Sequence, residues 1–292
     1  MVDSDNPSRP SSSSRWARLR SAIRKKGTTA PSAMSMFSFH SVSTTVLATE
    51  PPKHPDYEWL DYALPQGRIL LHQRKTQSTV SIQELAVQAV DNTGNIRTWP
   101  CEDLLGRILV DMLRPLGSVS ILELGAGMCG VSGLAIAAQL PNVSRIVLSD
   151  GNASCVDNLR ITVDANVAQN RIPSNVVAVD LLQWSRDKAA FATGETFDVV
   201  FASDCLFFES FHVDLMQTLR QVVTATGSIY LLQPSRGGSL ERFVSLAQEF
   251  FIIDVQSDFD PDVTAKHEAF SSDPKYVPSI HQPILVTMRR KN

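Results

Sequence analysis

The sequence predicts an α/β fold in which helices cover both faces of a mainly parallel sheet, preceded by a small β-rich N-terminal extension. Apolar, strand-like runs alternate with helical patterns from residue 119 to residue 288. A glycine-rich turn, residues 125–130, follows the first of these runs. The 292 residues are 43% hydrophobic and 20% charged, a balance that suffices for one large core with additions.

The composition also excludes several classes of protein. A formal net charge of −3 gives no indication of nucleic-acid binding. No run of 18 apolar residues is present, which excludes an ordinary membrane span. The four cysteines are widely spaced and lack C-x-x-C or metal-ligand spacing, so we expect reduced thiols and no metal. The N-terminus lacks the apolar core of a secretory signal. We therefore expect a monomer of the cytoplasm or the nucleus, with no membrane partner.

The N-terminal segment is basic and separate in character. Residues 1–14 are rich in Ser and Pro and are predicted to be disordered. In residues 15–26 (RWARLRSAIRKK), Trp16, Leu19 and Ile23 recur at helical spacing among six Lys and Arg. Such a helix can bind an acidic partner or a membrane surface. The alternatives are a solvated cap of the fold and the start of an organelle transit peptide. The first 30 residues carry a net +5, which leaves −8 on the rest.

The next segment reads as strands and then one helix. The runs MFSFHSV, YEWLDYAL, RILLHQR and TVSIQELAVQAV are β-like, and Gly67 in a short polar gap predicts a hairpin. A helix is predicted over residues 101–113, because Pro100 suits a first helical turn and Pro115 ends the pattern. We therefore divide the chain into a tail (1–14), a basic helix with a β-rich extension (15–98) and a main domain (99–292).

The main domain alternates strand and helix. Strands are predicted at residues 119–124, 145–149, 176–179, 197–202, 228–232, 252–255 and 284–288, and helices near 130–140, 153–169, 210–224 and 239–250. The last two strands have no helix between them, only a polar, Pro-containing loop over residues 257–283. We therefore expect the final strand to run antiparallel to its neighbours.

The glycine turn is the first candidate ligand site. Gly125, Gly127 and Gly130 fit G-x-G-x-x-G, so a dinucleotide is one possible ligand. Glu123, two residues before the first glycine, would repel a pyrophosphate and suits a ligand that carries an amine or a sulfonium. S-adenosylmethionine carries both cations and no phosphate. A helix-opening turn that binds nothing is the alternative.

Other polar and aromatic residues follow the neighbouring strands, at the edge where an open α/β sheet binds its ligand. Asp150, 25 residues beyond Gly125, can accept two ribose hydroxyls or can serve only as a helix cap. Trp184 follows the third strand and can lie against an adenine or close the core. Asp204 and Phe207 place a carboxylate and an aromatic ring after the fourth strand.

Several motifs together resemble a known family. They are DNTGNIRTWP (91–100), ILELGAGMCGVSGL (121–134), LSDGN (148–152), ASDCLFF (202–208) and the Arg236-Gly237 segment. In this order they are similar to the Rossmann-like, seven-strand S-adenosylmethionine-dependent methyltransferases, and within these to the protein-lysine methyltransferases of the calmodulin branch. The resemblance runs from residue 15 to the last residue.

The resemblance implies site residues and a substrate. The cofactor positions it implies are Trp99, Glu123, Gly125, Ala126, Gly127, Asp150, Asn152, Trp184 and Ser203. Glu123 would face the methionine amine and Asp150 the ribose, Trp184 would pack on adenine, and Trp99 would shield the methionine side. Asp204 and Phe207 would border the lysine channel as the catalytic candidates. The implied reaction methylates a calmodulin lysine, up to trimethyllysine.

The chemistry of methyl transfer fits these residues. An amine attacks only when it is neutral, and about one lysine in a thousand is neutral at cellular pH. Asp204 would therefore orient the amine more than act as a strong base. Phe207 and Phe208 can face a methylated ammonium or can pack in the core. The alternatives to this function are a nicotinamide oxidoreductase, a non-catalytic scaffold of the same fold, and the same chemistry on another protein lysine.

Overall fold

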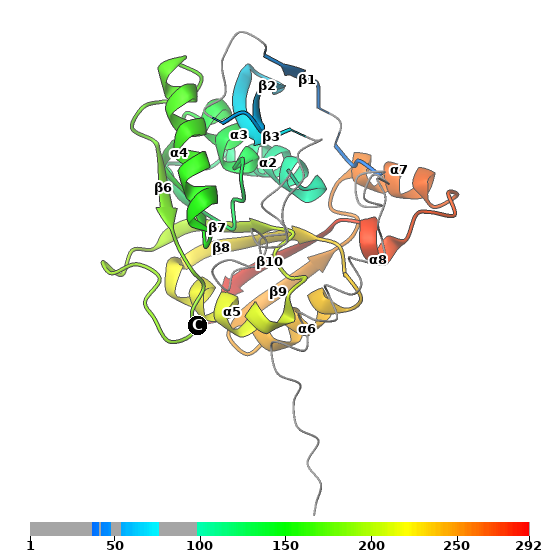
Figure 1. Ribbon diagram of the computed structural model, residues 1–292. Helices are drawn as coiled ribbons and strands as arrows, with labels where there is room; N and C mark the ends of the chain where they lie inside the picture. Colours follow the sequence, from blue (N-terminus) through cyan, green and yellow to red (C-terminus); the bar gives the residue numbers. More distant parts are fainter. Residues whose placement is uncertain (1–36, 41, 48–53, 76–97, 292) are drawn as a thin grey trace, which may run out of the picture. The chain divides into compact units, whose positions relative to one another are not determined.

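The structure is a computed structural model of the 292-residue chain that describes residues 37–40, 42–47, 54–75 and 98–291 (Figure 1). All of these belong to one compact unit, residues 37–292. The predicted tail, the basic helix, the β-like run TVSIQELAVQAV and the motif DNTGN lie outside the described residues. Among the residues described, no helix is both long enough and apolar enough to cross a bilayer.

The main sheet has seven strands in the order β6-β5-β4-β7-β8-β10-β9 (Figure 1). Their bounds are β4 (Val119–Leu124), β5 (Val143–Asp150), β6 (Val177–Leu181), β7 (Phe197–Ser203), β8 (Val223–Gln233), β9 (Phe251–Gln256) and β10 (Ile284–Arg290). Strands β6, β5, β4, β7 and β8 pair in parallel. Strand β10 pairs antiparallel with both β8 and β9, which confirms the orientation predicted for the final strand. All seven predicted strands are present.

Helices cover both faces of this sheet, as predicted. They are α2 (Pro100–Leu113), α3 (Val131–Gln139), α4 (Ala153–Ala168), α5 (His212–Val222), preceded by the 3₁₀ turn η4 (Glu209–Phe211), and α6 (Ser239–Ala247). Alternate residues of each strand pack into two separate hydrophobic cores, because successive side chains of a strand point to opposite faces of the sheet. Ile121 packs in the core that includes Leu105 and Leu134, whereas Leu122 packs in the core that includes Leu219 and Phe243. Figure 1 accordingly shows α2, α3 and α4 on one side of the sheet and α5 and α6 on the other.

The segment between β9 and β10 contains two helices, so the prediction of a loop without a helix is wrong. They are α7 (Pro261–Phe270) and α8 (Pro278–His281). Asp260 caps α7 by accepting the Val263 N–H at 3.0 Å, and Pro261 occupies the first turn. Val263 is the buried residue of this helix. A helix that buries so little carries no apolar stripe in its sequence, which explains why periodicity missed it.

The β-like run MFSFHSV forms no strand over its described residues 37–40 and 42, which corrects the first strand prediction. Phe37 and Phe39 pack instead against the α7–α8 segment. The Phe37 ring lies 5.2 Å from the Phe270 ring and 5.1 Å from the Tyr276 ring, between centroids. The two phenylalanine side chains are thus buried in an aromatic cluster and not in a sheet.

A second, three-stranded sheet precedes α2. Its antiparallel strands are β1 (Thr44–Val46), β2 (Tyr57–Ala63) and β3 (Arg68–Arg74), in the order β1-β2-β3. The predicted hairpin at Gly67 is confirmed: this residue has φ +92°, and its carbonyl accepts the Leu64 N–H at 3.0 Å. The left-handed backbone there suits glycine.

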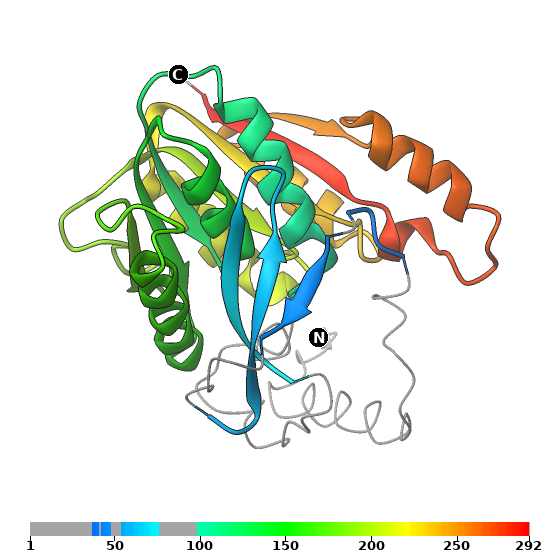
Figure 2. The ribbon, with the colours of Figure 1, turned by 90° about the horizontal axis from the view of Figure 1, so that it is seen from above.

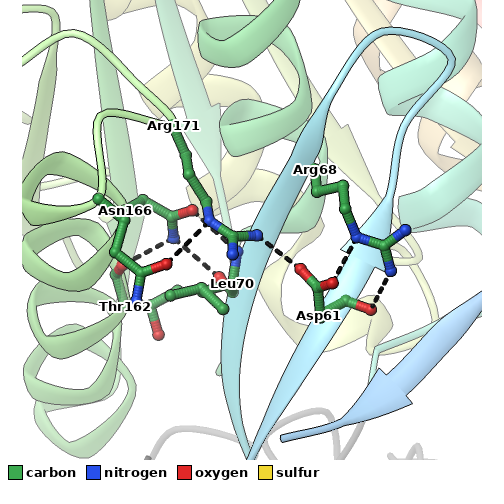
Figure 3. A network of polar contacts seen from close by, with 7 residues as sticks. Asp61, Arg68, Leu70, Thr162, Asn166 and Arg171 are labelled. Carbon is green, nitrogen blue, oxygen red and sulfur yellow. Dashed lines mark hydrogen bonds and ion pairs between the residues drawn. The ribbon is translucent and has the colours of Figure 1, made fainter.

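The small sheet is fixed to helix α4 by polar side chains (Figure 3). The Asn166 side chain accepts the Leu70 N–H at 2.8 Å and donates to the Leu70 carbonyl at 2.8 Å. Asp61 accepts hydrogen bonds from Arg171, at 2.5 Å, and from Arg68. Figure 2 shows β2 and β3, in light blue, beside the green helices, and β3 contacts both α3 and α4. The small sheet therefore belongs to the same compact unit as the main sheet, and it is attached to that unit through helix α4.

Candidate active site at the strand ends

The glycine loop between β4 and α3 has the backbone that the sequence predicts. Gly125, Gly127 and Gly130 have φ of +67°, +63° and +60°, in the left-handed region that glycine adopts without strain. A Cβ on Gly125 would lie 2.9 Å from the Cys205 Sγ and 3.3 Å from the Trp184 ring. Trp184 is half-buried. Its ring therefore lies against the glycine loop, at the edge where the prediction places it.

Asp150 lies at the end of β5 and contacts this loop directly. Its Oδ2 accepts the Gly127 N–H at 2.9 Å, and its Oδ1 accepts the Asn152 N–H at 2.8 Å. Burial raises the pKa of the Asp150 carboxyl, and these backbone N–H groups oppose the rise. The structure thus brings Asp150 and the glycine loop together, as the sequence predicts for a ribose-binding acid.

Glu123 is buried and caps helix α3. Its Oε2 accepts the Gly133 N–H at 3.1 Å, and a second buried acid, Glu102 of α2, accepts the Val131 N–H at 2.8 Å. Gly130, the residue before the helix, has no side chain to cap it, so these two carboxylates satisfy the orphan N–H groups. Burial raises the pKa of Glu123 to about 8. Glu102 was missed in the sequence, where it reads as an ordinary acid in a helical first turn.

Three further predicted cofactor residues have backbone or capping roles in the structure. The Asn152 side chain caps α4 by accepting the Ser154 N–H at 2.8 Å. Ala126 is 2% exposed, and its N–H donates to the Ser149 carbonyl at 2.9 Å. Ser203 is the half-buried last residue of β7. Their contacts with a cofactor remain a prediction.

Asp204 is ion-paired inside the protein. Its Oδ1 accepts from the Arg236 guanidinium at 2.7 Å and its Oδ2 accepts the Cys101 N–H at 3.3 Å. The side chains of Asp204 and Arg236 are 2% and 12% exposed. Both residues have a left-handed backbone, with φ of +49° and +52°. The carboxylate predicted to border a lysine channel is therefore held by three separate elements: the ends of β7 and β8 and the start of α2.

Aromatic rings flank this ion pair. The Trp99 and Phe207 rings stack with centroids 5.9 Å apart and planes at 25°. The Phe208 ring lies 4.5 Å from Phe207, and the Arg236 guanidinium carbon lies 5.3 Å from the Trp99 ring centroid. The structure thus joins Trp99, predicted on the cofactor side, to Phe207, predicted on the lysine side.

Arg236 is the functional candidate to which the sequence assigned no role, although its segment belongs to the motifs. The signal that could have found it is its place three residues after the end of β8, at the same edge of the sheet as Asp150 and Asp204. Gln233 ends that strand, and its Oε1 accepts the Leu206 N–H at 2.9 Å, so it fixes the start of the segment that carries Phe207.

The charge of the site tests which cofactor it suits. Burial raises the pKa of the Cys205 thiol, and the surrounding carboxyl groups of Asp150, Asp204, Glu123 and Glu102 raise it further. The positive charge of Arg236 is already neutralised by Asp204, so it is not free to bind a phosphate. A pyrophosphate would meet buried carboxylates, whereas an amine, a sulfonium and ribose hydroxyls would meet acceptors. These residues fit S-adenosylmethionine.

Comparison with known proteins identifies the family. The profile of the family described as lysine methyltransferase matches residues 105–250. A calmodulin-lysine N-methyltransferase of Arabidopsis thaliana is 29% identical over 280 residues, which are 90% of this chain and 90% of that protein. The mouse protein N-lysine methyltransferase METTL21A is 27% identical over 164 residues, 53% of this chain and 71% of the mouse protein.

Among solved structures, the ribosomal protein L11 methylase of Lactobacillus delbrueckii subsp. bulgaricus matches with a TM-score of 0.44 and 14% identity, over 67% of this chain and 81% of that one. A structural similarity at this level indicates nothing about function. The family match does indicate a function, and it excludes the nicotinamide oxidoreductase alternative. The chain belongs to the lysine methyltransferase family, and it is an S-adenosylmethionine-dependent protein-lysine N-methyltransferase.

Proposed function

We propose that this enzyme methylates a lysine of calmodulin, up to trimethyllysine. The observation that supports this substrate is the length of the alignment with the Arabidopsis relative, which covers 90% of this chain. That alignment extends beyond the family match at residues 105–250 into the N-terminal part, whereas the METTL21A alignment covers 53% of the chain. Similarity in the part that precedes the shared family region favours a shared substrate, because similarity confined to that region is expected of every member of the family.

On the cofactor side, the chain supplies acceptors and a flat apolar surface. Bound S-adenosylmethionine supplies an electrophilic methyl group on a sulfonium. Asp150 would accept the ribose hydroxyls, and the Trp184 ring beside Gly125 would face the adenine. Glu123, which caps α3 and is 2% exposed, would support the loop that faces the methionine amine through its hold on the helix N-terminus.

On the lysine side, the Asp204–Arg236 pair decides which form of the amine is favoured. A free carboxylate would hold the substrate as an ammonium, which cannot attack. The Arg236 guanidinium, 2.7 Å from Asp204, offsets that negative charge. Asp204 would then accept one hydrogen bond from the amine and orient its lone pair, while the nearby positive charge disfavours protonation.

The aromatic pair would hold the product of each transfer. A methylated ammonium is attracted to the face of an aromatic ring, by about 0.5–2 kcal/mol. The stacked Trp99 and Phe207 rings lie beside Asp204's ion pair and would line this channel. They would thereby keep a monomethylated or dimethylated lysine in place for a further transfer.

The proposed function is tested by a methylation assay with purified calmodulin and S-adenosylmethionine, read by intact-protein and peptide mass spectrometry. We expect mass increases of one to three methyl groups on one lysine. The matched control is the Asp150→Ala variant, which should give a smaller increase in the same time when the cofactor concentration is near the wild-type Kd. A parallel incubation with cell extract and labelled cofactor tests the other candidate, another protein lysine: label on other proteins, with purified calmodulin unmodified, would refute the calmodulin proposal.

A further inference from the structure

Asn158 of helix α4 connects the small sheet to the glycine loop. Its Nδ2 donates to two backbone carbonyls, that of His72 at 2.6 Å and that of Met128 at 2.8 Å. Its Oδ1 lies 2.6 Å from the His72 Nδ1. His72 belongs to β3 of the small sheet, and Met128 belongs to the loop between β4 and α3. One side chain therefore binds two segments that are far apart in the sequence.

The orientation of the Asn158 amide is fixed by its partners. Both carbonyls only accept hydrogen bonds, so the atom that faces them is the NH₂ group. The Oδ1 must then accept, which places the proton of the His72 ring on Nδ1. Asn158 is 4% exposed and His72 is 1% exposed, so water does not replace these contacts. Loss of the amide would leave buried acceptors without donors.

The glycine loop is thus held from two directions at adjacent residues. Asp150 accepts the N–H of Gly127 on the side where the cofactor acids gather, and Asn158 donates to the carbonyl of Met128 on the side of the small sheet. The small sheet adds a second contact, from the Tyr57 hydroxyl to the Met128 Sδ at 3.8 Å. The Tyr57 ring in turn stacks on His72, with centroids 4.8 Å apart and planes at 15°.

We propose that Asn158 is a positioning residue for cofactor binding, which couples the docked small sheet to the glycine loop. The three glycines of the loop have no side chains to hold their left-handed turns, so neighbouring residues must fix them. Asn158 fixes the carbonyl of Met128, and the small sheet fixes Asn158. The small sheet therefore supports the cofactor site through Asn158. This inference rests on the proposed placement of S-adenosylmethionine at the glycine loop.

Helix α4 offers a matched control. Asn166, two turns further along, is as buried as Asn158 and also binds β3, through the Leu70 backbone (Figure 3). The Asn166 side chain makes its described hydrogen bonds with the backbone of Leu70 and Thr162 and none with the glycine loop. Both variants to alanine remove a buried amide that docks β3 on α4, but only Asn158→Ala releases the loop.

The experiment measures S-adenosylmethionine affinity by calorimetry, thermal stability, and hydrogen exchange of the loop amides in the full-length chain without cofactor. We expect Asn158→Ala to raise the Kd for S-adenosylmethionine about tenfold and to speed exchange at residues 125–131, as for a lost buried hydrogen bond. Asn166→Ala should lower Tm but leave Kd within about twofold of wild type. A milder variant, His72→Phe, keeps a ring beside Tyr57 but loses the Nδ1 donor, and should raise Kd about threefold.

Asp150→Ala serves as the test of the cofactor site itself. If Asp150→Ala weakens binding while Asn158→Ala and His72→Phe bind as wild type, the positioning role is refuted and the site stands. If Asp150→Ala also binds as wild type, the proposed site is wrong. Equal weakening by Asn158→Ala and Asn166→Ala would likewise refute a specific role of Asn158, because the effect would then belong to docking in general. Should Asn158→Ala not fold, His72→Phe decides by the same Kd and exchange measurements.

Discussion

The two sides of the active site are built by different means. On the cofactor side, Asp150 and Glu123 bind backbone N–H groups of Gly127 and Gly133, which lie only 23 and 10 residues away. On the lysine side, Asp204 binds the Cys101 N–H, 103 residues away, and Arg236, 32 residues further on. The acids of the cofactor side therefore bind backbone within their own strand-turn-helix unit, and Asn158 adds a further contact to the loop from outside that unit. The lysine side exists only when the ends of three distant elements meet.

The two sides also differ in which groups surround their carboxylates. Burial raises the pKa of Asp150 and Glu123, because their partners are mainly neutral N–H groups. Asp204 instead faces the Arg236 guanidinium. The cofactor side thus gains from a cationic ligand, whereas the lysine side already contains its cation. Five predictions test this contrast.

The largest effect is expected from breaking the ion pair. Arg236→Asn tolerates the left-handed backbone but is too short to reach Asp204, and would leave a buried carboxylate unpaired. We expect the free energy of unfolding to fall by about 3–5 kcal/mol, measured by urea denaturation. The control, Arg242→Ala, breaks an exposed pair with Glu209 nearby and should unfold as wild type. Equal unfolding of Arg236→Asn and wild type would show that the pair does not support the lysine side.

The next effect concerns the cofactor side. Asp150→Ala should weaken S-adenosylmethionine binding by about 1.5–3 kcal/mol, the contribution of hydrogen bonds to a charged group. Asp150→Asn keeps one acceptor oxygen for the Gly127 N–H and should lose less. Calorimetry measures both. An unchanged affinity in a folded Asp150→Ala protein would remove Asp150 from the cofactor site.

A smaller effect is expected in the dependence of stability on pH. Burial raises the pKa of Glu123 to about 8 in the folded state, so the folded protein keeps a proton that the unfolded chain releases near its ordinary value of 4.5. The contribution of the protonated Glu123 to the free energy of unfolding is therefore complete below pH 4.5, and it is lost as the pH rises through about 8. Burial shifts Asp103 in the same direction, to about 6. The Tm should therefore decrease as the pH rises from about 6 to about 8, and this decrease should be smaller in the Glu123→Gln variant. The same slope in both proteins would contradict the buried proton.

The smallest effect is expected outside both sides of the site. If the basic residues 15–26 recruit acidic calmodulin, deletion of residues 1–26 should raise the KM for calmodulin and weaken its dependence on salt. The affinity for S-adenosylmethionine should not change. An unchanged KM at both low and high salt would show that this segment has no role in recruitment.

The same contrast explains what could be predicted from the sequence. The seven strands, the antiparallel last strand and the glycine turn follow from local patterns of apolar residues and glycine, which the sequence displays directly. Asp150 could be found because its distance from Gly125 is set by one strand-helix-strand unit. The partnership of Asp204 with Arg236 and Cys101 could not, because no local spacing relates the three. Helices α7 and α8 were missed because each buries a single residue, Val263 and His281, so neither shows an apolar stripe in the sequence.

The most direct test of the division between the two sides is a pair of measurements on Asp204→Asn. Asparagine tolerates the left-handed φ of +49° and retains one acceptor oxygen, so the fold and the cofactor side should persist. We predict an unchanged Kd for S-adenosylmethionine by calorimetry, together with a single-turnover rate of calmodulin methylation that falls at least about tenfold. A wild-type rate would show that Asp204 is only structural. A raised Kd with an unchanged rate at saturating cofactor would show that Asp204 belongs to the cofactor side, and the two sides would not be separate.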